Sequence, residues 1–534
     1  MKKQISTISL FFIILGTITG QNTFNYTVDL QPVNFIGLPG LHSYAFAESE
    51  GKWLIIGGRK DGIHARQPFN SFPLAENNAD IYVIDPVTQE FWSSSVNVLP
   101  TGLKEQLQST NMNFYQDNDT LFIIGGYAFS STANDHITFP NLTSVNVPSL
   151  IEAIINGSSI SSFFKQITNP SFAVTGGRLG KIGDMFFLVG GHQFEGRYNP
   201  MNHPTYIQTY TNQIRKFSIN NNGSQLSISN YAALTDPVHL RRRDYNLLPQ
   251  VFPDGQPGYT ISSGVFQLGV DLPFLYPVDI TESGYTPVTT FNQYLSNYHS
   301  AFACLYDSIA NEMHSLFFGG MSQYYYQNGV LIQNDQVPFV KTISLVSRSS
   351  DGNLQEFLLP VEMSALKGAG AEFIVNHEIP HFNSEIIHLN MFTTDTVLIG
   401  YIYGGILSPS LNPFSNNQTN STSATNAVYA IKLIKNQLSG VNEINGKNPY
   451  DIRISPNPVD KEFLVSFELT SSVNIDYYVT NSNGQLIIEG KIVQPVPGEN
   501  NQIIRLENIP GSQTFLVTFV FEDKYYVTKK VMTK

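Results

Sequence analysis

The sequence has one cysteine, two tryptophans and few charged residues. Cys304 alone forms no disulfide within the chain and supplies a single thiolate, which excludes a disulfide-stabilised fold and a cysteine-based zinc cluster. Charged residues make up 13 % of the 534 residues, about half the usual ~25 %. The chain has 30 basic and 42 acidic side chains, which gives a net charge of −12. This acidic balance argues against general nucleic-acid binding.

Glycine, proline and aromatic residues are plentiful instead. The chain has 40 Gly, 29 Pro, 27 Tyr and 37 Phe, a composition typical of short strands joined by turns. The length exceeds what one compact domain usually holds. We therefore expect an all-β protein with more than one domain.

The N-terminus predicts export. Lys2 and Lys3 precede an apolar run at 8–15 and a small-residue exit at 16–20, the pattern of a secretory signal peptide spanning residues 1–20. The run is shorter than the ~20 residues that a membrane helix needs, so we predict no membrane span. Removal of this segment would change the net charge from −12 to −14.

Residues 450–534 predict a separate small Ig-like β-sandwich. Five segments alternate apolar and polar residues, and Asn-Gly or Pro-Gly turns separate them. The segments are 463–467, 475–479, 485–488, 503–506 and 514–519.

Motifs of this domain resemble the C-terminal sorting domain of the type IX secretion system of Bacteroidetes. They are Pro456-Asn457-Pro458, the turn at Gly484, the turn at Gly511 and a lysine-rich end. The aromatic residue that usually follows the late glycine by two positions is missing after Gly511. The resemblance implies a partner, the type IX machinery, and release from the cell or attachment to its surface. An ordinary Ig-like binding module is the alternative.

An apolar strand ending in two glycines recurs through residues 21–445. The sixth copy has Ser263 in place of the first glycine. Each copy follows a strand and a turn and precedes an insert and a hairpin, which gives four antiparallel strands per repeat, as in a propeller blade. The glycine pairs are 57–58, 125–126, 190–191, 263–264 (Ser-Gly), 319–320 and 404–405.

The repeats resemble kelch repeats, which implies a six-bladed kelch-like β-propeller. The first repeat fits best, since Asp85-Pro86 leads to Trp92; the others lack the paired tyrosine and tryptophan. The repeats are longer than the ~50 residues of a kelch unit, so we expect inserts that project from one face. These inserts carry polar aromatic residues such as Tyr325, suited to a glycan or protein ligand. They are 59–79, 127–142, 192–213, 321–339 and 406–426.

Polar residues at the start of each repeat are expected to line an axial pocket. Arg243 belongs to the only dense basic cluster, and it either holds the carboxylate of a sugar acid or forms a structural ion pair with Asp244. The other candidates are His42, Asn111, Arg178, His299 and Glu372.

The sequence leaves two classes of function open. Kelch-like propellers include copper oxidases, but Cys304 near Tyr306 and His299 is explained more simply as a buried small residue. We find no zinc motif, nucleophile elbow or phosphate loop and predict no cofactor. A secreted or surface-displayed binding module for a glycan or protein is our first hypothesis. An extracellular carbohydrate-active enzyme with an axial active site is the alternative.

Overall fold

The computed structural model describes residues 24–201, 205–436, 442–444, 448–506 and 513–533. It is all-β, with two short helices, α1 (Thr101–Leu107) and α2 (Val147–Ile155). The signal peptide predicted at 1–20 and the motif residue Gly511 lie outside the described residues. Among those described, no helix is long and apolar enough to cross a membrane.

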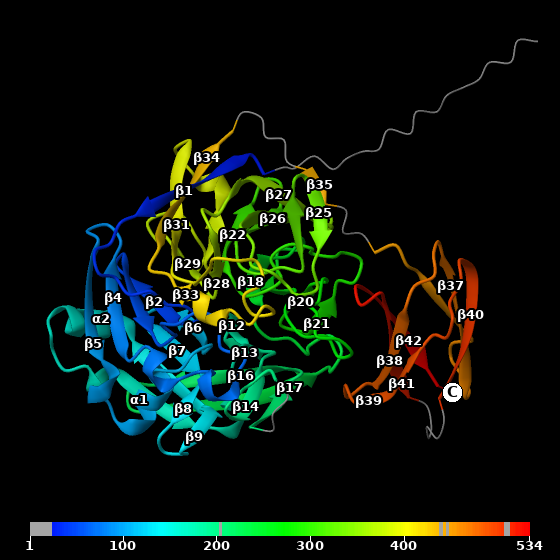
Figure 1. Ribbon diagram of the computed structural model, residues 1–534, viewed down its shortest axis with the longest axis horizontal. Helices are drawn as coiled ribbons and strands as arrows, with labels where there is room; N and C mark the ends of the chain where they lie inside the picture. The colour runs from blue at the N-terminus through cyan, green and yellow to red at the C-terminus, as the bar shows by residue number, and fades with distance from the viewer. Residues whose placement is uncertain (1–23, 202–204, 437–441, 445–447, 507–512, 534) are drawn as a thin grey trace, which may run out of the picture.

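Most strands lie in antiparallel sheets arranged around a common centre, so the fold is propeller-like (Figure 1). In five sheets the strands follow chain order from the inside outward. These are β2 (Ala45–Ser49), β3 (Lys52–Ile56), β4 (Asp80–Asp85) and β5 (Glu90–Ser95); β6 (Asn113–Asp117), β7 (Thr120–Ile124), β10 (Asn141–Asn146) and β11 (Phe164–Thr168); β12 (Arg178–Ile182), β13 (Met185–Val189), β16 (Gln213–Asn221) and β17 (Leu226–Thr235); β18 (Asn246–Val251), β19 (Pro257–Ser262), β20 (Val278–Ile280) and β21 (Tyr285–Pro287); and β22 (Ala301–Asp307), β23 (Glu312–Phe318), β26 (Thr342–Arg348) and β27 (Leu354–Glu362).

The sixth sheet joins the two ends of this region. Strands β29 (Glu372–Val375), β31 (Thr396–Tyr403) and β34 (Val428–Lys435) come from the last repeat, and β1 (Tyr26–Val33) pairs with β34 as its outer strand. No motif in the sequence predicted β1. Its pairing ties the start of the chain to the last repeat and closes the ring without a disulfide.

The glycine pairs connect neighbouring sheets. Both residues have positive φ at all six pairs, including Ser263 at 51°, a backbone region that favours glycine. The second N–H of each pair donates to a carbonyl at the entry of the next sheet, over 2.7–3.1 Å. The acceptors are Ser109, Val174, Arg242, Asn297, Lys367 and, returning to the first sheet, Leu41.

Four of the five inserts carry paired strands of their own, beyond the variable loops that we expected; the insert at 59–79 has two short 3-10 turns instead. The inserts extend from the sheet ends that bear the glycine pairs, which we call the loop face. Strands β9 and β14, from successive inserts, pair with each other. Two more strands, β30 (Ile386–His388) and β35 (Asn442–Ile444), extend the fifth sheet at its edges, where β30 pairs parallel with β22 and β35 pairs with β27. The strands outside the main sheets are β8 (Tyr127–Ser130), β9 (Asp135–Thr138), β14 (His192–Gly196), β15 (Tyr206–Tyr210), β24 (Tyr324–Gln327), β25 (Val330–Gln333), β28 (Leu366–Ala369), β32 (Ile406–Ser408) and β33 (Ser423–Ala424).

The C-terminal residues form two further sheets beside the ring, drawn in orange and red in Figure 1. Apolar side chains such as Val465 and Phe519 form a separate core between them. One sheet comprises β36 (Ile452–Ser455), β37 (Glu462–Leu469) and β40 (Gly498–Arg505); the other comprises β38 (Ile475–Asn481), β39 (Leu486–Lys491), β41 (Thr514–Phe521) and β42 (Tyr525–Met532).

Candidate functional site

Six backbone hydrogen bonds form a closed circle where the chain enters the six sheets. We call this circle the axial girdle. Each N–H donates to the carbonyl of the preceding member over 2.7–3.2 Å, and Ser43 returns the circle to Gly370. Backbone atoms of this circle therefore constrict the central channel of the ring. Its members are Ser43, Asn111, Gly176, Asp244, His299 and Gly370.

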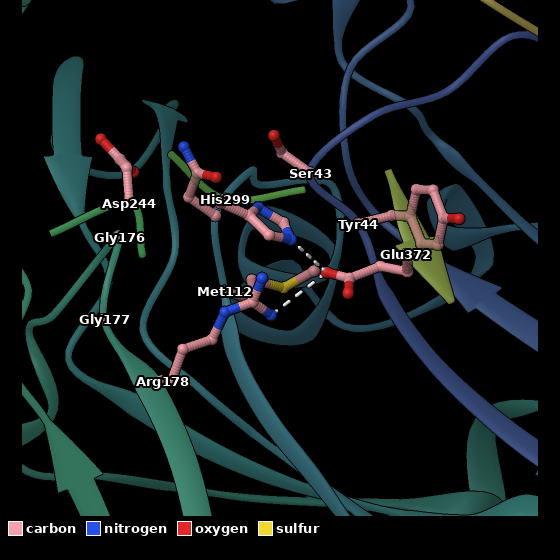
Figure 2. A pocket seen from close by; sticks show the side chains of 10 residues that line it. Ser43, Tyr44, Met112, Gly176, Gly177, Arg178, Asp244, His299 and Glu372 are labelled. Atoms are coloured by element: carbon pink, nitrogen blue, oxygen red, sulfur yellow. Dashed lines mark hydrogen bonds and ion pairs between the residues drawn. The ribbon is translucent and has the colours of Figure 1, made fainter. Parts of the chain in front are cut away.

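A small polar cavity, the axial chamber, lies at the girdle (Figure 2). Its volume is about 10 Å³, which is about the room that one water molecule needs. Arg178 at the start of β12 and His299 before β22 both reach Glu372 at the start of β29. Their nitrogens lie 3.1 Å and 2.9 Å from its Oε1.

The charges in the axial chamber are fixed by these contacts. Burial opposes ionisation of Glu372, but Arg178 and His299 together lower the pKa of its carboxyl. Burial and the charge of Arg178 lower the pKa of His299. At neutral pH we therefore expect an ionised Arg178–Glu372 pair beside a neutral His299. Nη2 of Arg178 has no hydrogen-bond partner among the described residues.

A larger cavity, the loop-face pocket, opens on the loop-face side of the girdle. Its volume is about 480 Å³, in the range of small-molecule sites. Four of the five inserts contribute to its wall, and the fifth reaches an adjoining recess of about 70 Å³ through Tyr127. The aromatic residues that line the pocket are Phe72, Tyr198, Tyr206, Tyr210, Phe266, Tyr298 and Phe414.

Two arginines of the basic cluster at 241–243 lie in the loop-face pocket. The guanidinium carbon of Arg241 is 3.7 Å from the ring centroid of Tyr210, close enough for a cation–π contact. Nε of Arg243 donates to the Tyr210 hydroxyl over 3.2 Å, and its Nη1 forms an ion pair with Asp244. The structural ion pair proposed from the sequence is therefore present, and it stands at the pocket wall.

Neutral histidines border the recess. Burial, assisted by the charge of Arg243, lowers the pKa of His64 to about 4. Burial and the charges of Arg243 and Arg241 hold the pKa of His192 well below its usual value. Both rings are thus neutral at neutral pH. Among the residues that the structure describes, no three His, Cys, Asp or Glu side chains are grouped to hold a metal ion.

The predicted axial residues lie together. Arg178, Asp244 and His299 line the axial chamber with Asn111 and Glu372, and His42 and Arg243 line the loop-face pocket. Nε2 of His42 is 3.9 Å from Oδ1 of Asp61, whose pKa falls to about 2 because His42 and Arg59 outweigh its burial.

Other predicted residues lie elsewhere. Tyr325 is half-buried on β24 and lines none of the cavities described above. Cys304 is buried on β22, with its Sγ 3.8 Å from Ser315 Oγ. Burial raises the pKa of the Cys304 thiol to about 12, so it stays protonated at neutral pH.

The sorting-motif residues have structural contacts. Asn457, between Pro456 and Pro458, donates to the carbonyl of Lys530 over 2.8 Å and accepts from the N–H of Met532 over 2.9 Å. These contacts fasten the last strand. Gly484 has a φ of 75°, and a Cβ there would lie 2.0 Å from the carbonyl oxygen of Thr235 in β17, so it permits close approach of the two domains.

A second large cavity lies at the opposite ends of the sheets, where the β2–β3 and β6–β7 turns lie. Its volume is about 710 Å³. His377 contacts Glu48 through Nδ1 and Glu385 through Nε2, the latter over 2.9 Å. Burial alone would lower the pKa of His377, but the two carboxylates raise it to about 10.

Comparisons with known proteins give distant structural likenesses only. No family model and no curated protein matches the chain. The structure of YjhT is similar with a TM-score of 0.42 and 11 % identity, over 75 % of this chain and 99 % of that one. A glycoside hydrolase family 43 arabinoxylan arabinofuranohydrolase from Bacillus subtilis, in complex with cellotetraose, is similar with a TM-score of 0.25 and 10 % identity, over 79 % and 94 % of the two chains. Likeness at this level says nothing about the activity of this chain.

Proposed function

We propose that this protein is an exported binding module that holds a glycan in its loop-face pocket. In this proposal the six sheets are the blades of a kelch-type propeller. Residues 1–20 direct export, and residues 450–534 are a type IX sorting domain of Bacteroidetes that leads to secretion or display at the cell surface. The recurring glycine pairs and the separate C-terminal core support this organisation.

The lining of the loop-face pocket carries the functional proposal. Aromatic rings offer flat apolar faces to the C–H groups of a sugar, while guanidinium, amide and carboxylate groups bind its hydroxyls. Tyr206, Gln208 and Tyr210 occupy every second position of β15, so their side chains share one face of the strand and line the pocket wall with Arg241. A concave pocket of this volume suits a small ligand better than a protein surface.

A carbohydrate-active enzyme is the second candidate, because acidic groups line the same cavity. Asp244 stands at the girdle, and Asp271 and Asp335 stand in the wall. Glu372 is 4 % exposed and bound to Arg178. The axial chamber has room for water but not for a sugar ring, so bond cleavage would have to use groups above the girdle.

Glycan-array binding by the mature chain, followed by titration, tests the proposal. We expect Tyr206→Ala to weaken binding at least about tenfold, the effect usual for an aromatic anchor. Tyr231→Ala is the matched control, because Tyr231 is 44 % exposed on β17 outside the pocket. Equal binding by both variants, or no glycan bound by the mature chain, would refute the proposal. Release of sugar products from a bound polysaccharide would favour the enzyme instead.

A further inference from the structure

The C-terminal domain contacts a segment that also forms part of the loop-face pocket. Residues 264–277 lie in the connection between β19 and β20, and they contain no strand or helix. Phe266 and Asp271 of this segment line the pocket. On the other side, Tyr526 of β42 packs its ring 4.4 Å from that of Tyr276. The segment is therefore a wall between the pocket and the domain.

Gln267 is the centre of this contact. Its side chain is almost fully buried, at 3 % exposure. The hydroxyl of Tyr526 donates to its Oε1 over 2.5 Å, and its Nε2 donates to the carbonyl of Asp523 over 2.8 Å. Nε2 also donates to the carbonyl of Pro273, within the segment, over 2.8 Å. Both ends of the amide are thus bound by the C-terminal domain, and removal of that domain would take away both of these hydrogen bonds and uncover the side chain, leaving only its bond to Pro273.

The fixed amide adjoins the pocket directly. Nη1 of Arg241 donates to the carbonyl of Phe266 over 2.5 Å and to that of Gln267 over 3.1 Å. The ring of Phe266 lies 4.9 Å from the guanidinium carbon of Arg243. A shift of Gln267 would therefore move a pocket arginine and a pocket ring.

The turn before β42 makes a second contact with the ring of sheets. Nζ of Lys524 lies 4.7 Å from the ring centroid of Tyr294, and its carbonyl accepts from Asn292 Nδ2 over 3.2 Å. The hydroxyls of Tyr294 and Tyr525 are 3.1 Å apart. This contact holds the chain just before Tyr298, another residue of the pocket.

We infer that the docked C-terminal domain braces the wall of the loop-face pocket, so that loss of the domain loosens residues 264–277 and weakens ligand binding. The part that concerns ligand rests on the proposed function; the brace itself does not. A chain that keeps the domain and a chain that has lost it would then differ in affinity for the same ligand.

Hydrogen–deuterium exchange of the mature chain tests the brace without any ligand. Tyr526→Ala removes the ring contact and the hydroxyl donor, and Tyr526→Phe removes the donor alone. We expect exchange in 264–277 to accelerate roughly five- to tenfold in the alanine variant, as loss of a buried hydrogen bond and its packing implies, and less in the phenylalanine variant. Residues 45–56, in β2 and β3, should not change, because their side chains pack in cores that contain none of the described residues of the C-terminal domain.

The control variant is Ile503→Ala, since Ile503 is half-exposed on β40 in the other sheet of the domain. Exchange in 463–469 reports whether the domain stays folded. If Tyr526→Ala unfolds the domain, the brace is lost altogether and 264–277 must exchange faster still. Unchanged protection of 264–277 in either situation overturns the inference. If exchange responds while no form of the protein binds a glycan, the brace stands and the proposed function fails.

Discussion

Gly125→Ala should destabilise the ring far more than an ordinary glycine substitution. Gly125 is the first glycine of the second pair, with a φ of 70°, and a Cβ there would lie 1.8 Å from the carbonyl oxygen of Val174. That carbonyl accepts hydrogen bonds from Gly126 N over 3.1 Å and from Asn113 Nδ2 over 2.9 Å. The methyl group would force this carbonyl, and the entry to the third sheet, away from the second sheet.

Three terms add to the expected loss. Left-handed backbone in a residue with a Cβ costs roughly 1–2 kcal/mol. Overpacking against the backbone costs about 1–3 kcal/mol, and weakening two hydrogen bonds costs about 1 kcal/mol more. We expect the free energy of unfolding to fall by about 3–6 kcal/mol. Gly51→Ala is the control, because Gly51 has a φ of 78° with no heavy atom within 4 Å of its Cβ position, so only the roughly 1–2 kcal/mol backbone cost applies.

Urea unfolding followed by tryptophan fluorescence measures the difference. Both tryptophans lie in the first sheet, Trp53 on β3 and Trp92 on β5, so their emission reports on the ring rather than on the C-terminal domain. Gly125→Ala should unfold at much lower urea than Gly51→Ala, with a similar slope. Equal midpoints for the two variants would refute the role of the glycine pair as a close contact between sheets.

Three further predictions concern buried charge. Burial raises the pKa of Glu356 from 4.5 to about 8, so this group lowers stability as pH rises from 4.5 to 8, and Glu356→Gln should flatten that part of the Tm-against-pH curve. The pKa of His377 is raised from 6.5 to about 10 in the folded protein, so its contribution to stability is full below pH 6.5 and is lost as the pH rises towards 10. The Tm difference between His377→Gln and wild type should therefore shrink over that window. A constant difference would contradict the charged contact. Glu372→Gln leaves the buried Arg178 charge without a full counter-charge and should cost up to about 3–5 kcal/mol; in urea unfolding, the double variant Arg178→Met/Glu372→Leu should recover part of that loss.

The repeat was visible in the sequence because its cause is local. A chain that must adopt two successive positive φ angles against a neighbouring carbonyl selects glycine, so the pairs stand out. Ser263 was recognised from its surroundings, and its φ of 51° confirms that it occupies the same position. The Ser263 hydroxyl donates to the carbonyl of Phe274 over 2.5 Å, so the polar side chain has a hydrogen-bond partner.

Features that depend on contacts distant in sequence were missed. Strand β1 pairs with β34 some four hundred residues later, and nothing within 26–33 indicates that partner. The loop-face pocket takes Tyr206, Arg241 and Phe414 from separate inserts and connections, so no local motif marks it. Tyr325 illustrates the converse, since a suitable residue type in the correct insert still does not line the cavity.

The axial residues were found from their place in the repeat, but their partners were not. Position at the entry of an inner strand was enough to gather Arg178, His299 and Glu372 at the axis. Which side chains come into contact depends on how successive sheets are placed around the axis. The hydrogen bonds of the girdle link these sheets at their entries. Arg178 in the third sheet contacts Glu372 in the sixth, directly across the ring, a pairing that no spacing in the sequence encodes.

The girdle also decides how the loop-face pocket is reached. Its six hydrogen bonds of 2.7–3.2 Å leave no passage for a sugar, and the axial chamber holds about one water molecule. A ligand must therefore enter and leave by the loop face, where it meets the inserts before it meets the axis. Because the glycine pairs and the girdle use mostly backbone atoms, the inserts can vary without disturbing them. Under the proposed function, ligand choice would thus reside in residues such as Tyr206, while the fold resides in the repeat.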